Sequence, residues 1–181
     1  MDKRFAVQTS LTGNEIKELR KQLKLTQRDF AVLLGISKPT IERWEVSDKP
    51  ITGPVVLLIH MLSQNPGYVK ELEIPPKELQ LRLFYMYKDR ICTLIDVDAT
   101  NQKVEIRNYV DNLQFRAFGR NEKPSYVEYE EFLESRCFPR TRDKLSIVLK
   151  DLDLPFYDPL MIIEKTMGKM AEDDFWIKVE R

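Results

Sequence analysis

The sequence is poor in the residues on which metal sites and covalent catalysis depend. Its 181 residues include one histidine, His60, and two cysteines, Cys92 and Cys137, which lie far apart and form no CxxC pair. This spacing argues against a disulfide framework and against a zinc site. A single histidine also makes histidine-based metal clusters and most histidine-centred catalysis hard to build. We therefore expect a protein that is not an enzyme, with no catalytic residues, no metal ligands and no cofactor.

Long apolar segments are also missing. The longest apolar run spans residues 55–61 and is far shorter than a membrane span. His60 lies inside this run and is expected to be packed. Residues 1–10 lack the apolar run of a signal peptide. We expect a cytoplasmic protein that makes no membrane contact, and free cysteines suit that reducing compartment.

The chain also lacks an excess of charge of either sign. Its 29 basic and 29 acidic residues give a formal charge of +0, so no chain-wide basic field indicates a nucleic-acid ligand. The distribution is uneven, because residues 3–49 carry ten basic and six acidic residues, whereas residues 74–181 carry eighteen and twenty. The N-terminal third is thus the better candidate for phosphate contact, although a solvated surface often has the same excess.

Apolar residues recur at helical spacing through the first 72 residues. Thr26 and Ser37 are good N-caps, and Gly35 can take the left-handed conformation that ends a helix in a tight turn. In the third helical pattern, Ile41 and Trp44 face inward. The predicted helices span residues 12–23, 26–34, 37–45, 52–65 and 66–72.

A change of composition divides the chain at EIPPK, residues 73–77, where two prolines beside charged residues disfavour a continuing helix. Beyond it, the β-branched runs RICTLIDV and KVEIRNYV, separated by DATNQ, predict a β-hairpin. Helical patterns at residues 125–135, 141–152 and 158–166 and a short apolar strand pattern at 175–179 follow. We predict an α+β protein with an all-α domain at residues 1–73 and a small α+β domain at residues 78–181.

The stretch LTQRDFAVLLGISKPTIERWE, residues 25–45, joins two short helical patterns through a turn that contains a glycine. This is the arrangement of a helix-turn-helix, whose second helix can enter a DNA major groove. The start of the first helix, with Gln27, is expected to bind a phosphate. The second helix is expected to present Lys38, Thr40 and Arg43 outward. A helix-turn-helix that makes only protein contacts is the alternative.

Residues 12–70 resemble the Xre class of λ-repressor and Cro-type DNA-binding domains, through the pattern of LTQ, LG, S and IxxWE in the quoted stretch. The resemblance implies a λ-repressor-like helix-turn-helix domain. It also implies an internal ion pair between Arg20 and Glu45 that ties the first helix to the end of the third. The continuation PITGPVVLLIHMLSQNPGYVKEL is similar to MqsA-type antitoxins, although the N-terminal zinc finger of that subgroup is absent here.

The resemblance places base-reading positions on Lys38, Pro39 and Arg43. Pro39 stands where the family usually has Gln or Asn and can at most touch a thymine methyl group, so readout falls to the two cations, which suit guanine O6 and N7. Gln27 is expected to contact phosphate. The complete set of candidate DNA-binding residues is Gln27, Arg28, Ser37, Lys38, Pro39, Thr40 and Arg43.

Residues 86–179 resemble the module at the start of HipA-like kinase toxins. The match rests on Met86, Lys88, Asp89, Arg136, Pro139, Thr141, Arg142, Gly168, Asp173 or Asp174, and Trp176, while Tyr87 and Asp153 depart from the pattern. No kinase catalytic set follows, so the resemblance implies the accessory module without the enzyme.

Arg136, Arg140 and Arg142 cluster in sequence around Thr141, whose hydroxyl is expected to cap the next helix. Three guanidiniums near a helix start could bind an anion, either a phosphate or a carboxylate of a partner. Pairing of these arginines with Glu131 and Glu134 within the chain is an equally good interpretation.

These observations predict a sequence-specific transcriptional regulator that binds double-stranded operator DNA as a homodimer. In its most specific form it is the autoregulating antitoxin, and repressor, of a type II toxin–antitoxin system, with a cognate toxin as partner. An accessory subunit of a split HipA-like kinase toxin and a phage or mobile-element repressor are the alternatives.

Overall fold

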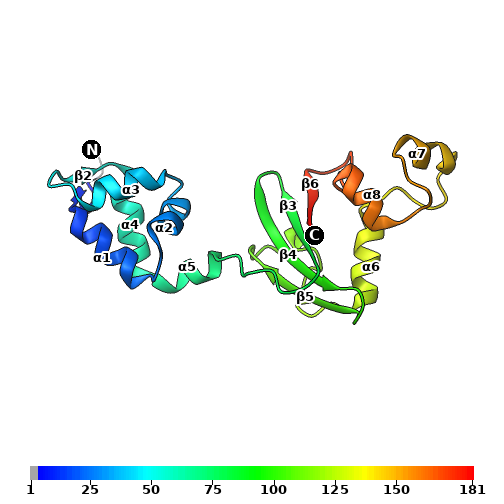
Figure 1. The fold of residues 1–181 in the computed structure, drawn as a ribbon, viewed down its shortest axis with the longest axis horizontal. Coiled ribbons are helices and arrows are strands. Elements are labelled where there is room, and N and C mark those ends of the chain that lie inside the picture. The colour runs from blue at the N-terminus through cyan, green and yellow to red at the C-terminus, as the bar shows by residue number, and fades with distance from the viewer. Residues whose placement is uncertain (1–3) are drawn as a thin grey trace. The chain divides into compact units, whose positions relative to one another are not determined.

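The computed structural model describes residues 4–181, and the chain divides between Ile74 and Pro75 into two compact units (Figure 1). Helices and antiparallel sheets are both present, in agreement with the predicted α+β class. Within residues 4–181, none of the helices has the length and apolar character that a membrane crossing requires.

The N-terminal unit consists of helices and one very short sheet, so the prediction that it is all-α is wrong in this detail. Its elements are β1 (Ser10–Leu11), α1 (Gly13–Gln22), α2 (Gln27–Leu33), α3 (Lys38–Glu45), β2 (Ile51–Thr52), α4 (Pro54–Gln64) and α5 (Pro66–Leu72). Thr12 begins α1 with a capping box, since its hydroxyl accepts from the Glu15 N–H while the Glu15 carboxylate accepts from the Thr12 N–H. The core of the unit contains Ile16, Phe30 and Ile41, all fully buried.

Two predictions for α4 are wrong. The helix begins at Pro54 rather than at Thr52, which instead pairs with Ser10 in the short sheet. Gly53 precedes the helix with φ of 100°, a conformation that favours glycine. His60 is exposed rather than packed, because the core-facing positions of α4 are occupied by Val56, Ile59 and Leu62.

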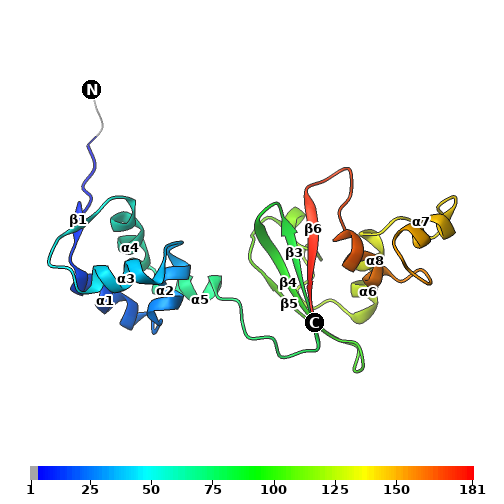
Figure 2. The same cartoon turned by 45° about the horizontal axis from the view of Figure 1, so that its top comes forward.

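The C-terminal unit is a four-stranded antiparallel sheet in the order β5-β4-β3-β6, with helices on one face (Figures 1 and 2). Its elements are β3 (Leu81–Tyr87), β4 (Arg90–Asp98), β5 (Lys103–Asn108), a 3-10 turn η1 (Leu113–Phe115), α6 (Tyr126–Ser135), α7 (Leu145–Asp151), α8 (Pro159–Thr166) and β6 (Phe175–Glu180). The predicted hairpin is confirmed as β4–β5, with Asp98 opposite Lys103. The strand predicted at residues 175–179 is confirmed as β6.

The central strand β3 was not predicted. It pairs with β4 on one side and with β6 on the other. Leu83 and Tyr85 belong to the main core, while Phe84 and Met86 belong to a small cluster on the opposite face. Because both faces are apolar, LRLFYMY has no alternation to mark it as a strand.

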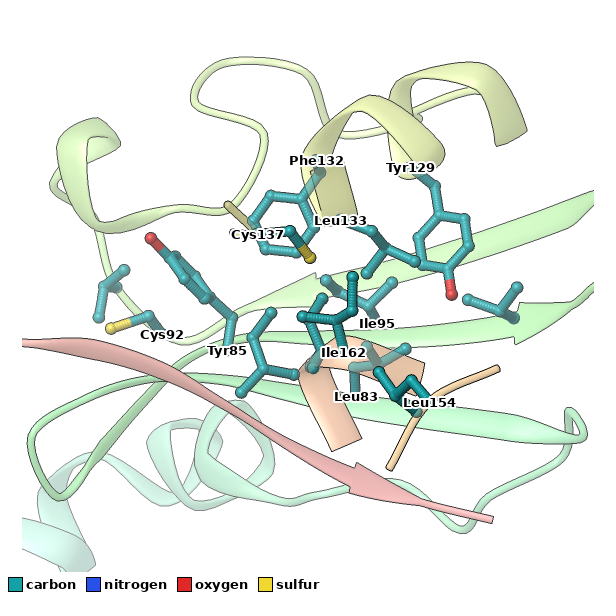
Figure 3. Packing of buried hydrophobic residues seen from close by; sticks show 14 residues of the cluster. Leu83, Tyr85, Cys92, Ile95, Tyr129, Phe132, Leu133, Cys137, Leu154 and Ile162 are labelled. Carbon is teal, nitrogen blue, oxygen red and sulfur yellow. The ribbon is translucent and has the colours of Figure 1, made fainter. Parts of the chain in front are cut away.

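The main core lies between the sheet and helices α6 and α8 (Figure 3). Leu83, Ile95, Ile162 and Ile163 are fully buried there. Tyr85 makes an edge-to-face contact with Phe132 of α6, at 5.2 Å between ring centroids. Cys92 and Cys137 are buried thiols in the same core, and burial raises the pKa of both, that of Cys137 to about 12.

The cap predicted for the helix after Pro139 is wrong. Helix α7 begins at Leu145, and the residue before it is Lys144, which has φ of 57° and makes no side-chain cap. Thr141 is exposed in the preceding turn.

Candidate DNA-binding site

Helices α2 and α3 are joined by a tight turn. Thr26 begins α2, where its hydroxyl accepts a hydrogen bond from the Asp29 N–H, as predicted. The helix ends at Leu33, and Gly35 takes the left-handed conformation with φ of 67°. Ser37 then precedes α3, but its hydroxyl bonds to the Thr40 hydroxyl at 2.9 Å rather than to a backbone N–H. The tight turn at Gly35 therefore fixes the orientation of α3 relative to α2.

The inner side of α3 fixes the helix to the domain. Ile41 is fully buried, and Trp44 is half-buried against the core. Gly13 at the start of α1 approaches the end of α3 so closely that a Cβ there would lie 2.2 Å from the Trp44 carbonyl oxygen. Only glycine allows this contact, which makes the position of α3 depend on backbone packing as well as on side chains.

An ion pair at the end of α3 connects three helices. The Arg20 guanidinium of α1 donates to both carboxylate oxygens of Glu45, from Nε at 2.6 Å and from Nη2 at 3.0 Å. Gln27 at the start of α2 donates to the same carboxylate at 2.9 Å. The hydrogen bond from Arg20 lowers the pKa of Glu45, despite its burial. The Arg20–Glu45 pair that the resemblance implied is confirmed.

The outer side of α3 carries the predicted base-reading residues. Lys38, Pro39 and Arg43 are exposed, and Thr40 is half-buried. Lys38 Nζ donates to Glu42 Oε1 one turn along the helix, at 2.6 Å. Within residues 4–181, Arg43 has no hydrogen-bond or ion-pair partner. Arg43 is therefore the cation of α3 that can bind an external group at no cost in internal contacts.

The two candidates at the start of α2 differ in availability. Arg28 is exposed and also lacks a partner in the part of the chain that the structure describes. Gln27 is half-buried, and its amide already donates to Glu45. A phosphate contact from Gln27 must use the second hydrogen of that amide. The bond to Glu45 fixes the orientation of the amide.

Glu42 is a residue of this surface that the sequence analysis missed. Its carboxylate lies on the outer side of α3 beside Lys38 and is 44% exposed. A carboxylate repels phosphate but can accept a hydrogen bond from cytosine N4. The i,i+4 spacing of Lys38 and Glu42 was a usable signal for the pair.

The three arginines proposed for anion binding have different partners. Arg136 is 8% exposed and donates to the carbonyl oxygens of Gly168 and Phe175 and to both carboxylate oxygens of Asp173. It joins the end of α6 to the segment before β6.

The other two arginines are exposed. Arg140 Nε donates to Glu134 Oε1 at 3.0 Å, which was one of the pairings considered, and its guanidinium lies 4.5 Å from the centroid of the Tyr157 ring. Arg142 lies over the Phe138 ring at 5.6 Å. Arg136 therefore stabilises the fold. Of the three arginines, Arg142 is the one that has no carboxylate partner among the described residues.

Comparison with known proteins gives one match. Residues 16–60 match the helix-turn-helix family, a segment that includes the Arg20–Glu45 pair and all of α2 and α3. Neither the curated proteins nor the solved structures include a significant match to the chain. The family match supports an Xre-type helix-turn-helix and a DNA-binding transcription regulator.

Proposed function

We propose that this protein is a sequence-specific transcription regulator that inserts α3 into the major groove of an operator. The observation that carries the proposal is the two-sided character of α3. Ile41, Trp44 and Glu45 fix one side to the domain, while Arg43 extends from the other side without a partner in the described chain. This is the geometry that base reading by a rigid helix needs.

Base contacts are assigned to Arg43 and Lys38. Either side chain can bind guanine O6 and N7, and Arg43 does so bidentately in the most common specific contact in protein–DNA complexes. Lys38 must first leave Glu42, so its contribution is smaller. Arg28 at the start of α2 is assigned to phosphate, where it adds affinity without sequence preference.

We further propose that the regulator is a homodimer joined through α4. Leu57 and Met61 on this helix are more than half exposed, at 52% and 56%, and Leu58 is 39% exposed. The helix, PVVLLIHMLSQ, contains no acidic residue, lysine or arginine. Two copies can therefore meet along α4 without repulsion between like charges.

Sedimentation of the full chain tests this dimer. Met61→Glu places a charge in the proposed interface and is expected to convert the dimer to a monomer, whereas the exposed control Lys21→Glu is expected to stay dimeric. A Met61→Glu protein that remains dimeric contradicts the proposal.

The operator assignment is tested by selecting binding sites from a random duplex pool with the full chain. We expect an inverted repeat whose half-sites are about one helical turn apart. Arg43→Ala is expected to cost about 1–3 kcal/mol and to relax the preference at one position of each half-site. Lys21→Ala, an equal loss of charge on α1, serves as the control. A protein that selects no sequence, or an Arg43→Ala variant with unchanged preference, contradicts the proposal.

The biological role that we propose is that of an autoregulating antitoxin, acting in the cytoplasm and assigned no catalysis of its own. Support comes from the likeness of residues 50–72 to MqsA-type antitoxins and of residues 86–179 to the accessory module of HipA-like toxins. The test expresses the product of the adjacent gene with and without this chain. We expect growth arrest by that product alone, relief by co-expression, and tighter operator binding by the complex. A harmless neighbour, or toxicity that this chain does not relieve, overturns the role.

A further inference from the structure

A groove lies in the C-terminal unit between α6 and the start of α8, with a volume of about 470 Å³. Its lining is acidic and aromatic. Four carboxylates line it, those of Glu130, Glu131, Glu134 and Asp158, together with a single cation, Arg140. Tyr126, Tyr129 and Tyr157 supply aromatic rings.

The carboxylates of this groove are not all used within the protein. Glu134 accepts from Arg140, and Asp158 caps α8 through the Met161 N–H at 2.8 Å. Glu130 and Glu131 are exposed and have no hydrogen-bond or ion-pair partner among residues 4–181. Two full negative charges on one side of α6 are thus left for an external cation.

Tyr129 gives a second and independent indication of a ligand. Its side chain is 3% exposed and lines the groove. Its hydroxyl has no hydrogen-bond partner in the described part of the chain and keeps part of that exposed area, because no fully buried side-chain oxygen among the described residues lacks a partner. The ring extends from α6 with its hydroxyl directed away from the helix (Figure 3). Burial is the main cause that raises the pKa of this hydroxyl, and the charges of Asp158 and Glu130 raise the pKa further. The hydroxyl therefore stays protonated and keeps oxygen lone pairs for a donor within a negative potential.

The chain also shows how a guanidinium is held at one end of the groove. Arg140 lies over the Tyr157 ring, at 4.5 Å from its centroid, and donates to the Glu134 carboxylate. An aromatic face beside a carboxylate is a favourable site for a cation. Tyr126 and Glu130, one helical turn apart on α6, also line the groove, and burial followed by the Glu130 charge raises the pKa of Tyr126, so an aromatic ring and a carboxylate lie near each other here as well.

We propose that the groove between α6 and α8 binds an arginine-containing segment of a partner protein, with the guanidinium between Glu130 and the Tyr126 ring and a donor directed at the Tyr129 hydroxyl. The guanidinium suits the site better than a compact ammonium, because it is planar, stacks on aromatic rings and donates in several directions. This proposal is independent of DNA binding. It assigns the partner contact to the acidic groove rather than to Arg136, Arg140 and Arg142.

The test uses the full ¹⁵N-labelled chain and the dipeptide N-acetyl-Arg-Arg-amide, with its citrulline counterpart as a neutral control of the same shape. We expect the arginine peptide to shift the amide signals of residues 126–134, 157, 158 and 160, and the citrulline peptide to leave them in place. Glu130→Gln/Glu131→Gln is expected to weaken binding about two- to fivefold for each carboxylate removed. Glu172→Gln, at an exposed carboxylate outside the groove, is expected to change nothing.

Tyr129→Phe tests the hydroxyl separately, because it keeps the ring in the core. It is expected to weaken the arginine peptide without changing the thermal unfolding of the unit. Operator affinity must stay unchanged in every groove variant, which separates this proposal from the proposed function. Equal binding of the citrulline peptide, or unchanged affinity in the Glu130→Gln/Glu131→Gln protein, overturns the proposal. Tighter binding of spermidine than of the arginine peptide at the same amides would assign the groove to free polyamines and also overturn it.

Discussion

Replacing Arg20 with alanine tests what holds the recognition helix in place. Arg20 donates twice to Glu45 and once, at 3.1 Å, to the Leu25 carbonyl oxygen. The Glu45 side chain is only 4% exposed, so water cannot replace the lost donors fully. In Arg20→Ala, the carboxylate at the end of α3 keeps a single donor, the Gln27 amide.

The size of the effect follows from burial. Removing one partner of a buried ion pair costs about 3–5 kcal/mol, because a charge is left without compensation. The Gln27 amide remains and the Arg20 side chain is 15% exposed, so we expect the lower end, about 3 kcal/mol at pH 7. Lys21→Ala breaks an exposed pair with Glu18 and is expected to cost between about 0 and 1 kcal/mol.

The same pair predicts a pH dependence. The pKa of Glu45 is lowered in the folded protein, so the pair contributes stability above the unfolded value of 4.5 and loses it as the pH falls through the folded pKa. The deficit of Arg20→Ala must therefore shrink between pH 7 and pH 3. Urea unfolding followed by Trp44 fluorescence in a Trp176→Phe background reports the N-terminal unit alone. A deficit as large at pH 3 as at pH 7, or one below about 1 kcal/mol at pH 7, would refute the reasoning.

Three further predictions concern other contacts. Glu42→Gln is expected to tighten binding to any duplex about two- to fivefold, measured by fluorescence anisotropy, because it frees Lys38 and removes a charge that repels phosphate; weaker binding contradicts this. Gly13→Ala is expected to destabilise the N-terminal unit by about 2 kcal/mol or more in urea unfolding, because its Cβ would lie 2.2 Å from the Trp44 carbonyl oxygen. Gly67→Ala, where a Cβ meets nothing within 4 Å, should leave stability unchanged or slightly raised, and equal losses in the two variants would show that close packing is not the cause. Arg136→Met is expected to destabilise the C-terminal unit by about 3–5 kcal/mol, followed through Trp176 in a Trp44→Phe background, whereas Arg140→Met should cost less than about 1 kcal/mol; similar losses contradict the structural role of Arg136.

The helix-turn-helix could be predicted because its signals are local. Thr26, Gly35 and the apolar spacing of Phe30, Ile41 and Trp44 all lie within residues 25–45. Each of these residues acts on segments that lie close by in the sequence, so the local pattern predicts the structure directly. The hairpin of β4 and β5 was visible for the same reason, since its strands are joined by a short polar loop.

The features that were missed depend on contacts between distant segments. Strand β3 is apolar on both faces, and only its pairing with β6, more than eighty residues later, makes it a central strand. Arg136 was assigned to an anion because of its sequence neighbours, whereas its partner Asp173 lies 37 residues away. The acidic groove likewise forms only when the start of α8 packs beside α6. The local pattern of one sequence does not predict which distant segments pair.

The central claim, that the outer side of α3 reads DNA, is tested most directly by chemical-shift mapping of the full ¹⁵N-labelled chain with its selected operator duplex. The account predicts that the largest changes fall on the amides of Lys38 and residues 40–43 and on the side-chain Nε–H of Arg43, with smaller changes at residues 27 and 28. Changes confined to residues 75–181, or an α3 whose signals do not move at saturating duplex, would contradict it.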